Sequence, residues 1–139
     1  MEYVRIKEDR FEELCRLHAA YKLEIGEDAP SEDDLASLGR ATDREDILFF
    51  GCVDGDRLVG CCSVCPTYST FNYARGGVFE DFYVLPEYRH KGVARGLVRF
   101  AFAESGVASL TVGCADCDVA MYEALGFGVR LGNMLAYNG

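Results

Sequence analysis

The spacing of hydrophobic residues predicts several helices. Asp9 can cap a first helix whose apolar stripe consists of Phe11, Leu14, His18, Tyr21 and Ile25. The acidic run Ser31 to Asp34 has the composition of a helix start, and the second helix should end near Gly39. A third helix follows residue 92, because one face would hold Val93, Leu97, Phe100, Ala101 and Glu104. A short fourth helix is expected over residues 116–125.

Alternating and continuous apolar runs predict the strands. They cover residues 3–6, 47–53, 57–65, 78–84 and 109–114, and a terminal hairpin over 129–137 turns at Gly132-Asn133. Asp54-Gly55-Asp56 favours a tight turn between the second and third strands, whereas residues 66–77 are typical of a loop. No linker, repeat or low-complexity stretch interrupts this order. We therefore expect one α/β domain over residues 1–139.

Composition narrows the class of protein. Half of the residues are hydrophobic, which is enough for a core, and the formal net charge is -9. The acidic balance argues against nucleic acid and favours a cationic or neutral small-molecule partner. Neither a signal-peptide region nor an apolar run of membrane-spanning length occurs, so we expect a cytoplasmic protein without a membrane partner.

The seven cysteines do not predict a metal site. Cys62 and Cys65 form one C-x-x-C pair and Cys114 and Cys117 form another, but the pairs are far apart in sequence, unlike those of zinc ribbons. Residues 62 and 65 would also point to opposite faces of a strand. Buried free cysteines are the simpler interpretation, and no bound metal is predicted.

The basic turn before the third helix is the strongest candidate for a binding site. Five basic side chains fall within eleven residues of an acidic chain, namely Arg89, His90, Lys91, Arg95 and Arg99. Basic residues at a helix N-terminus oppose the helix dipole, so a bound anion would offset them. The small residues Gly92 and Ala94 let the backbone approach such a ligand. A strand that leads through this turn into a helix is a place for a pyrophosphate.

Two motifs carry a resemblance to a known family. Glu80-Asp81-Phe82-Tyr83-Val84-Leu85-Pro86 runs into Arg89-His90-Lys91-Gly92-Val93-Ala94, and Met121-Tyr122-Glu123-Ala124-Leu125-Gly126-Phe127 follows downstream. Together they resemble the acetyl-CoA-binding core of the GNAT acetyltransferase superfamily, whose loop reads Gln/Arg-x-x-Gly-x-Gly/Ala. The strand motif is similar to that of the spermidine/spermine-like branch. The resemblance is specific from about residue 78 to 127 and looser elsewhere.

The resemblance implies a fold and a cofactor site. The fold is a GNAT-like mixed, mostly antiparallel sheet flanked by helices, with splayed fourth and fifth strands that hold the pantetheine arm of acetyl-CoA, the co-substrate. The implied cofactor-binding residues are Phe82, Tyr83 and Val84 on the strand and Arg89, His90, Lys91, Gly92, Val93, Ala94 and Arg95 in the loop. Lys91, Arg95 or Arg99 would reach the 3′-phosphate. Ala115 stands where many members have a pantetheine-binding asparagine, which removes one cofactor contact.

Acetyl transfer to an amine needs a donor for the thioester oxygen, an acid for the leaving thiolate and a route for the amine proton. The backbone N–H of Val84 suits the first task, and by resemblance Tyr122 is the acid. Glu80 is the candidate for base or acceptor binding, acting directly or through water. Strand alternation puts Asp81 on the opposite face unless a bulge intervenes, so Asp81 is expected to be structural.

The two histidines are the obvious titratable alternatives for the base, and neither is expected to serve as the base. His18 belongs to the apolar stripe and His90 to the phosphate loop. No histidine is placed beside a thiol by motif, so direct transfer in a ternary complex is favoured over a covalent acetyl-enzyme.

The acceptor is predicted only by class. Six acids between the first two helices border the family's acceptor mouth and either attract a cationic amine or form a solvated, helix-capping loop: Glu24, Glu27, Asp28, Glu32, Asp33 and Asp34. The aromatic loop 68–73 either lines the same pocket or only connects strands. The expected activity is N-acetylation of a small cationic amine. Acetylation of a protein N-terminus or lysine, and a non-catalytic acyl-CoA-binding regulatory module, are the alternatives. Residues 131–137 either supply an edge strand for a homodimer or simply close the monomer.

Overall fold

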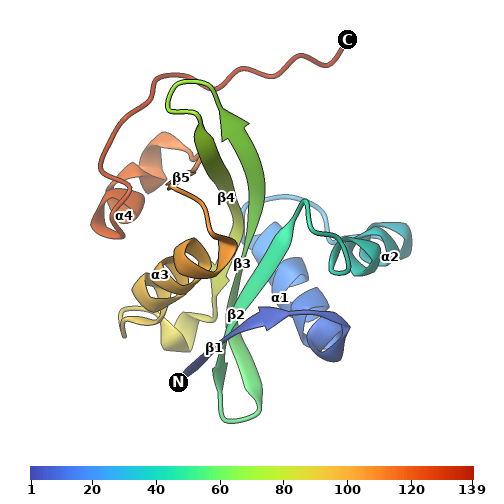
Figure 1. Cartoon of the computed structure of the whole chain (residues 1–139). Coiled ribbons are helices and arrows are strands. Elements are labelled where there is room, and N and C mark those ends of the chain that lie inside the picture. Colours follow the sequence, from blue (N-terminus) through green and yellow to red (C-terminus); the bar gives the residue numbers. More distant parts are fainter.

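One twisted sheet forms the centre of the molecule (Figure 1), and the computed structural model describes all residues from 1 to 139. Its strands follow the chain order from β1 to β5. The strands are β1 (Glu2–Ile6), β2 (Leu48–Asp54), β3 (Arg57–Ser69), β4 (Ala74–Val84) and β5 (Ser109–Thr111). Neighbours from β1 to β4 pair antiparallel, and β4 pairs with β5 in parallel. The expected mixed, mostly antiparallel sheet is confirmed.

Helices cover both faces of this sheet (Figure 1). On one side lie α1 (Phe11–Glu24) and α2 (Glu32–Ala41), and on the other lie α3 (Val93–Ser105) and the short α4 (Val119–Ala124). Three 3₁₀ turns, η1 (Glu8–Arg10), η2 (Pro86–Tyr88) and η3 (Asp116–Asp118), precede α1, α3 and α4.

Strand alternation divides the core between the two faces of the sheet. The core on the α1 side contains Leu14 and Leu17 of α1 together with Ile6, Phe49, Val53, Leu58, Cys61 and Tyr83. The core on the α3 side contains Leu97, Val98 and Ala101 of α3 together with Leu48, Phe50, Cys62, Val64 and Phe79. Consecutive residues of β2 and β3 therefore belong to different cores, which fixes the register of both strands.

The splay between the fourth and fifth strands is also present. Parallel pairing of β4 with β5 is limited to Gly76–Val78 against Ser109–Thr111. Beyond Val78, β4 continues to Val84 and pairs with β3 on one side only. Its other edge therefore faces an opening between β4 and β5.

The helix starts are only partly as the sequence predicts. Ser31 caps α2 through a capping box, in which its hydroxyl accepts from the Asp34 N–H at 3.1 Å and the Asp34 carboxylate accepts from the Ser31 N–H at 2.9 Å. The prediction that Asp9 caps α1 is wrong. Asp9 lies within η1, and Arg10 precedes α1 without a side-chain cap.

Two predicted loops and strands are also corrected. The segment 66–77 is mostly strand, because β3 runs to Ser69 and β4 starts at Ala74, which makes one long hairpin. The terminal hairpin over residues 129–137 does not form. Val129, Leu131 and Leu135 are exposed, and an isolated hairpin that buries no apolar face is at best marginally stable.

Candidate functional site

The start of α3 presents unpaired backbone donors. Gly92 precedes the helix in the left-handed conformation, with φ at +85°, and no side chain caps it. Gly96 N donates to the Gly92 carbonyl at 3.1 Å, which is the first bond of the helix. The N–H groups of residues 93–95 come before that bond and have no helical acceptor. With no acid in the first turn, they and the helix dipole suit an anion.

The Arg89 side chain is held by acceptors within the protein, so it is not free to bind a phosphate. Its Nε donates to the Val84 carbonyl at 2.9 Å, and its guanidinium makes a forked ion pair with Glu24 of α1, with both N–O distances at 2.9 Å. The group also lies over the Tyr83 ring, 5.4 Å from the ring centroid. Arg89 therefore joins the end of β4 to the end of α1.

The other basic residues near the start of α3 differ in whether their side chains bond within the protein. Arg95 donates to the Ala124 carbonyl at the end of α4, at 2.8 Å, and so bridges α3 and α4. Lys91 is exposed and lies over the Tyr88 ring at 5.9 Å. His90 and Arg99 are exposed and make no side-chain hydrogen bond or ion pair, and His90 has φ at +61°. Lys91 and Arg99 therefore have cationic groups near the start of α3 that no acceptor within the protein holds.

The backbone of β4 offers a donor to the opening. The Leu85 N–H points at β3, where it donates to the Val59 carbonyl at 2.9 Å. In a trans peptide the preceding carbonyl points the opposite way, so the Val84 carbonyl faces away from β3 and accepts from Arg89 there. In an extended strand the N–H of a residue lies on the same side as its carbonyl, so the Val84 N–H also faces the opening. Tyr83 alternates with it and turns its backbone groups to β3.

A β-bulge in β4 brings two carboxylates onto one face. Ser63 pairs with Glu80 and Cys61 with Tyr83, so Cys62 alone opposes two residues of β4. Asp81 is the extra residue of the bulge, and its φ is +54°. Its carboxylate accepts from the buried Ser63 hydroxyl at 2.6 Å, which puts it on the Ser63 side of the sheet.

Glu80 lies on this same side, because it is the cross-strand partner of Ser63 and the residue before it, Phe79, fills the core on the α3 side. The expectation of opposite faces for Glu80 and Asp81 is thus corrected. Both carboxylates belong to the α1 side of the sheet.

Tyr122 of α4 lies beside the opening between β4 and β5. Its ring packs against Phe82 of β4 and Phe127, with centroids 6.1 and 5.7 Å away. Burial, followed by the nearby Tyr21, raises the pKa of Tyr122 to about 12. The phenol therefore keeps its proton at neutral pH, as an acid that protonates a leaving thiolate must.

Tyr21 is a site residue that the sequence pattern hid. It occupies a position of the predicted apolar stripe, yet burial, then Asp81 and more weakly Glu80, raise its pKa. The same hydroxyl acts on Tyr122. The Tyr21 side chain packs against the core on the α1 side of the sheet, the side to which both carboxylates of β4 belong. The one available signal was that His18 and Tyr21 bring an imidazole and a hydroxyl group into a stripe whose other members are fully apolar.

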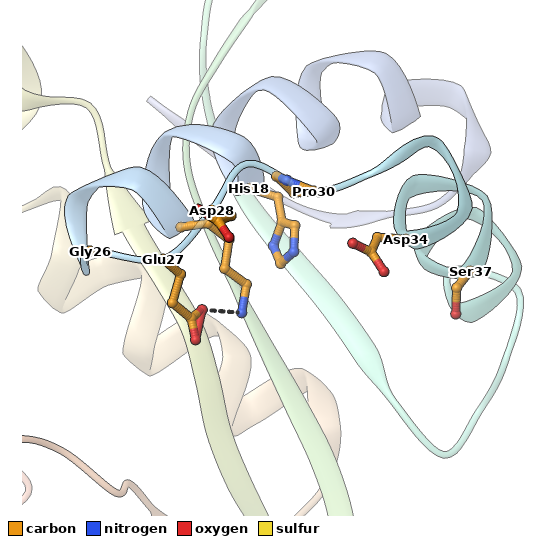
Figure 2. A pocket seen from close by; sticks show the side chains of 8 residues that line it. His18, Gly26, Glu27, Asp28, Pro30, Asp34 and Ser37 are labelled. Carbon is orange, nitrogen blue, oxygen red and sulfur yellow. Dashed lines mark hydrogen bonds and ion pairs between the residues drawn. The ribbon is translucent and has the colours of Figure 1, made fainter.

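A cavity of about 630 Å³ lies between α1 and α2, and Figure 2 shows the side chains around it. The lining is almost entirely polar and comprises His18, Lys22, Gly26, Glu27, Asp28, Pro30, Asp34 and Ser37. The His18 ring points into the space between the two helices, with Asp34 across from it (Figure 2). Half of the predicted acidic cluster therefore lines one cavity or caps the helix beside it.

The acids between α1 and α2 divide into two groups. Glu24 pairs with Arg89, Glu27 pairs with Lys22 at 3.0 Å, and Asp34 belongs to the capping box. The carboxylates of Asp28, Glu32 and Asp33 are exposed and make no ion pair. The helix-capping interpretation thus holds for part of the run, and of the three unpaired acids only Asp28 lines the cavity.

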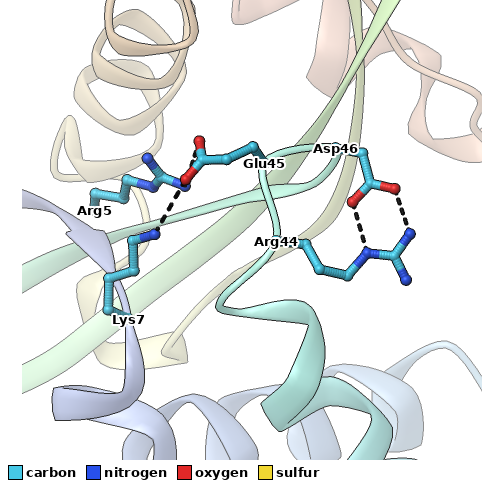
Figure 3. Close-up of polar contacts among 5 residues, drawn as sticks. All are labelled: Arg5, Lys7, Arg44, Glu45 and Asp46. Atoms are coloured by element: carbon cyan, nitrogen blue, oxygen red, sulfur yellow. Dashed lines mark hydrogen bonds and ion pairs between the residues drawn. The ribbon is translucent and has the colours of Figure 1, made fainter.

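Ion pairs also fix the chain that follows α2 (Figure 3). Glu45 accepts from Arg5 of β1 at 3.3 Å and lies 3.5 Å from Lys7, while Arg44 pairs with Asp46. These pairs are exposed and contribute little stability individually, but they tie the exit of α2 to β1.

The cysteines do not form a metal site, although the Cys61 thiol donates to the Asp81 carbonyl at 3.8 Å. Cys52, Cys61 and Cys62 are buried, and Cys114 and Cys117 are exposed. No three histidine, cysteine, aspartate or glutamate side chains gather as a metal-holding group. No helix has both the length and the apolar character needed to cross a membrane.

Solved structures support the fold assignment across the whole chain. A probable acetyltransferase aligns over 100% of both chains with a TM-score of 0.83 and 23% identity. An acetyltransferase of Clostridium acetobutylicum, solved with acetyl-CoA, aligns over 99% of this chain and 95% of its own, with a TM-score of 0.79 and 13% identity. An aminoglycoside acetyltransferase from an uncultured soil metagenomic sample, solved with sisomicin, has the same coverage, a TM-score of 0.78 and 14% identity.

Sequence comparison agrees with the structural likeness. No curated protein matches the chain. The model of the acetyltransferase (GNAT) domain matches residues 45–129, which is more than half of the chain and includes the bulged strand, the basic loop and Tyr122. The chain therefore belongs to the GNAT acetyltransferase superfamily, whose members use acetyl-CoA as co-substrate.

Proposed function

We propose that this protein transfers the acetyl group of acetyl-CoA directly to a primary amine of a small cationic acceptor, within a ternary complex. The observation that carries the proposal is the bulge at Asp81. It leaves Glu80 and Asp81 on one face, beside the opening between β4 and β5. Two adjacent carboxylates form a site for an ammonium group at the point where a thioester would lie.

The cofactor side of the reaction uses backbone groups. The free N–H groups at the start of α3 fit a pyrophosphate, and the basic residues around them offset its charge. Phe82 and Val84 would pair with the pantetheine arm along the open edge of β4. The Val84 N–H would stabilise the negative charge that develops on the thioester oxygen.

The amine nitrogen must give up two protons, and the leaving thiolate must gain one. The acceptor ammonium loses its first proton, and its nitrogen then forms a bond to the acetyl carbon while the carbon–sulfur bond breaks. The leaving thiolate takes a proton from the Tyr122 hydroxyl, whose raised pKa keeps that proton available, and the second proton of the nitrogen restores the phenol through water. Glu80 is exposed and unpaired, so it can hold the ammonium or relay its proton through water.

The preference for a cationic acceptor rests on charge and on one relative. Glu27, Asp28 and Asp34 line the cavity between α1 and α2, the carboxylate of Asp28 makes no ion pair, and the chain as a whole is strongly acidic. The aminoglycoside acetyltransferase of similar fold was solved with sisomicin, a polyamine sugar. Small multivalent amines therefore lead the list of acceptors to test.

The first test measures CoA release from acetyl-CoA with polyamines, aminoglycosides, amino acids and N-terminal peptides. The proposal expects release with small cationic amines. Release only with peptides would instead favour a protein acetyltransferase. Binding of acetyl-CoA without release from any acceptor would favour a regulatory module. The exposed Cys114 and Cys117 react with thiol reagents, so the readout is blanked with enzyme alone.

Substitution of Tyr122 tests the chemistry. Tyr122→Phe should lower kcat by about 100-fold or more, because the leaving thiolate loses its acid, while KM for acetyl-CoA changes little. Tyr137→Phe is the matched control, since it removes one hydroxyl from a side chain that is 92% exposed. An unchanged kcat for Tyr122→Phe would remove Tyr122 from the mechanism.

A further inference from the structure

The Arg89 guanidinium is fixed from three directions, by groups of both β4 and α1. Its Nε donates to the Val84 carbonyl at 2.9 Å, and its two terminal nitrogens each lie 2.9 Å from an oxygen of Glu24. It also lies over the ring of Tyr83, 5.4 Å from the centroid, and that residue is buried. A planar guanidinium whose fork closes on a carboxylate keeps one orientation, so the Nε–H keeps one direction as well.

Glu24 stands where a carboxylate does not favour its own helix. It is the last residue of α1, and the dipole of a helix favours cations rather than anions at that end. The pair with Arg89 leaves 46% of the Glu24 side chain exposed, and exposed ion pairs contribute little to stability. The stability of α1 therefore does not explain this carboxylate, whereas its contact with the Arg89 fork does.

Arg89 in turn holds the residue at the end of the open strand edge. Val84 is the last residue of β4, and its carbonyl faces the opening between β4 and β5, where it accepts from Arg89. The N–H and the carbonyl of one residue in an extended strand share an edge, so a bond that fixes the carbonyl also fixes the direction of the N–H. The Val84 N–H is the donor that the proposed reaction needs at the thioester oxygen.

We propose that Glu24 is a positioning residue for acetyl transfer, which closes the fork of Arg89 and thereby keeps the Val84 N–H aimed at the thioester oxygen. This inference rests on the proposed function. Glu24 acts through Arg89 and needs no contact with either substrate. A donor that is already oriented stabilises the developing negative charge without rearrangement during the reaction, whereas a loosened donor must be ordered again in each turnover.

This role replaces the two that the sequence suggests for these residues. The acidic run was expected to attract a cationic acceptor and the basic loop to bind phosphates, but Glu24 and Arg89 offset each other's charge within the pair. Lys91, Arg99 and the N–H groups at the start of α3 remain for the anion. Loss of Glu24 should therefore affect the rate of transfer rather than the binding of acetyl-CoA.

The main test is Glu24→Gln, which keeps the size of the side chain and removes its charge. With saturating acetyl-CoA and acceptor, kcat should fall about 10-fold, because a misdirected donor loses part of the transition-state stabilisation that an oxyanion donor supplies. The Kd for acetyl-CoA, measured by calorimetry, should stay within about twofold of the wild-type value. Tm should shift by less than about 3 °C. A merely structural contact would instead change Kd or Tm and leave kcat intact, and that result would overturn the inference.

Glu87→Gln is the matched control. Glu87 lies in η2, just before the basic loop, and it forms an exposed ion pair with Arg57 at 3.2 Å. This variant removes one negative charge close to the same loop without touching Arg89, so its kcat should match the wild type. An equal loss of kcat in both variants would assign the effect to charge alone and would contradict the role of Glu24.

A double-mutant cycle tests whether Glu24 acts through Arg89. Arg89→Met should lower kcat at least as much as Glu24→Gln, and adding Glu24→Gln to Arg89→Met should cause no further loss. Arg89→Lys, which lacks the planar fork, serves the same cycle if the methionine variant does not fold. Losses that multiply would show that Glu24 acts elsewhere. If the wild type releases no CoA with any amine, the proposed function itself fails, whereas an unchanged kcat in Glu24→Gln beside an active wild type defeats only this inference.

Discussion

At the scale of single residues, the site depends on one backbone irregularity. Asp81 adopts a positive φ that residues other than glycine rarely take, although Asp and Asn tolerate it better than most. The buried Ser63 hydroxyl bonds the Asp81 carboxylate at 2.6 Å and so helps to hold that conformation. The Glu-Asp pair was recognisable from the sequence, but its shared face was not. Alternation predicts opposite faces, and only the pairing with β3 reveals the extra residue.

We predict that Ser63→Ala lowers the free energy of unfolding by about 1–3 kcal/mol, because Asp81 Oδ2 loses its hydrogen-bond donor in a poorly hydrated setting. Urea unfolding measures this change. Ser109→Ala removes an exposed hydroxyl that makes no hydrogen bond, so it should change the free energy of unfolding by less than about 0.5 kcal/mol. Equal losses in the two variants would show that the Ser63–Asp81 contact does not stabilise the bulge.

At the scale of elements, the anion-binding end of α3 is positioned by packing against β1. Gly96 on the first turn of α3 touches the Tyr3 side chain so closely that an added Cβ would lie 1.9 Å from the Tyr3 hydroxyl oxygen. Tyr3 in turn donates to the Val93 carbonyl at 3.4 Å. The basic loop and the helix after it follow from local sequence, since Gly92 and the spacing of Val93 and Leu97 identify them. The contact of α3 with β1, which is distant in sequence, does not follow from local sequence.

Gly96→Ala should therefore destabilise the protein by about 1–3 kcal/mol, because the new methyl group has no room beside Tyr3. It should also raise KM for acetyl-CoA, since the start of α3 must shift. Gly128→Ala is the control, because nothing lies within 4 Å of its Cβ position and its φ is not in the left-handed region. Thermal unfolding and initial rates together test both effects, and wild-type behaviour of Gly96→Ala would contradict the packing argument.

At the scale of the whole molecule, charge is distributed unevenly. The chain carries a net charge of -9, yet five basic residues lie within residues 89–99 around the start of α3, and three carboxylates, those of Glu27, Asp28 and Asp34, line the cavity between α1 and α2. The two helix pairs lie on opposite faces of the sheet (Figure 1). An anionic co-substrate and a cationic acceptor would thus approach different regions with opposite potentials.

Salt should affect the two substrates differently. Raising ionic strength from about 0.05 to 0.5 M shortens the Debye length roughly threefold, so KM for a multivalent cationic acceptor should rise several-fold. KM for a monoamine should rise much less, and it serves as the control for general effects of salt on the enzyme. Identical salt dependence for the two acceptors would mean that the acidic cavity does not attract the substrate.

The sequence by itself determined the features that depend on neighbouring residues. Periodicity predicted the helices and most strands, and the Gly92 turn, with its basic neighbours, predicted an anion site at the start of α3. Prediction from the sequence failed where long-range contacts decide the outcome. The terminal segment has hairpin-like residues but no apolar surface to pack against, so it stays extended, whereas residues 66–69 and 74–77 become strand because each finds a partner across the hairpin.

Only the tertiary structure decided which side chains meet. Arg89 pairs with Glu24 and donates to the Val84 carbonyl, and the bulge places Asp81 on the α1 side of the sheet. His18 belongs by spacing to an apolar stripe, yet it lines the polar cavity between α1 and α2, with its ring 6.3 Å from that of Tyr21. The physical reason is that helical spacing fixes the direction of a side chain relative to its own helix. What that direction points at depends on how strands and helices pack, which no local pattern of residues encodes.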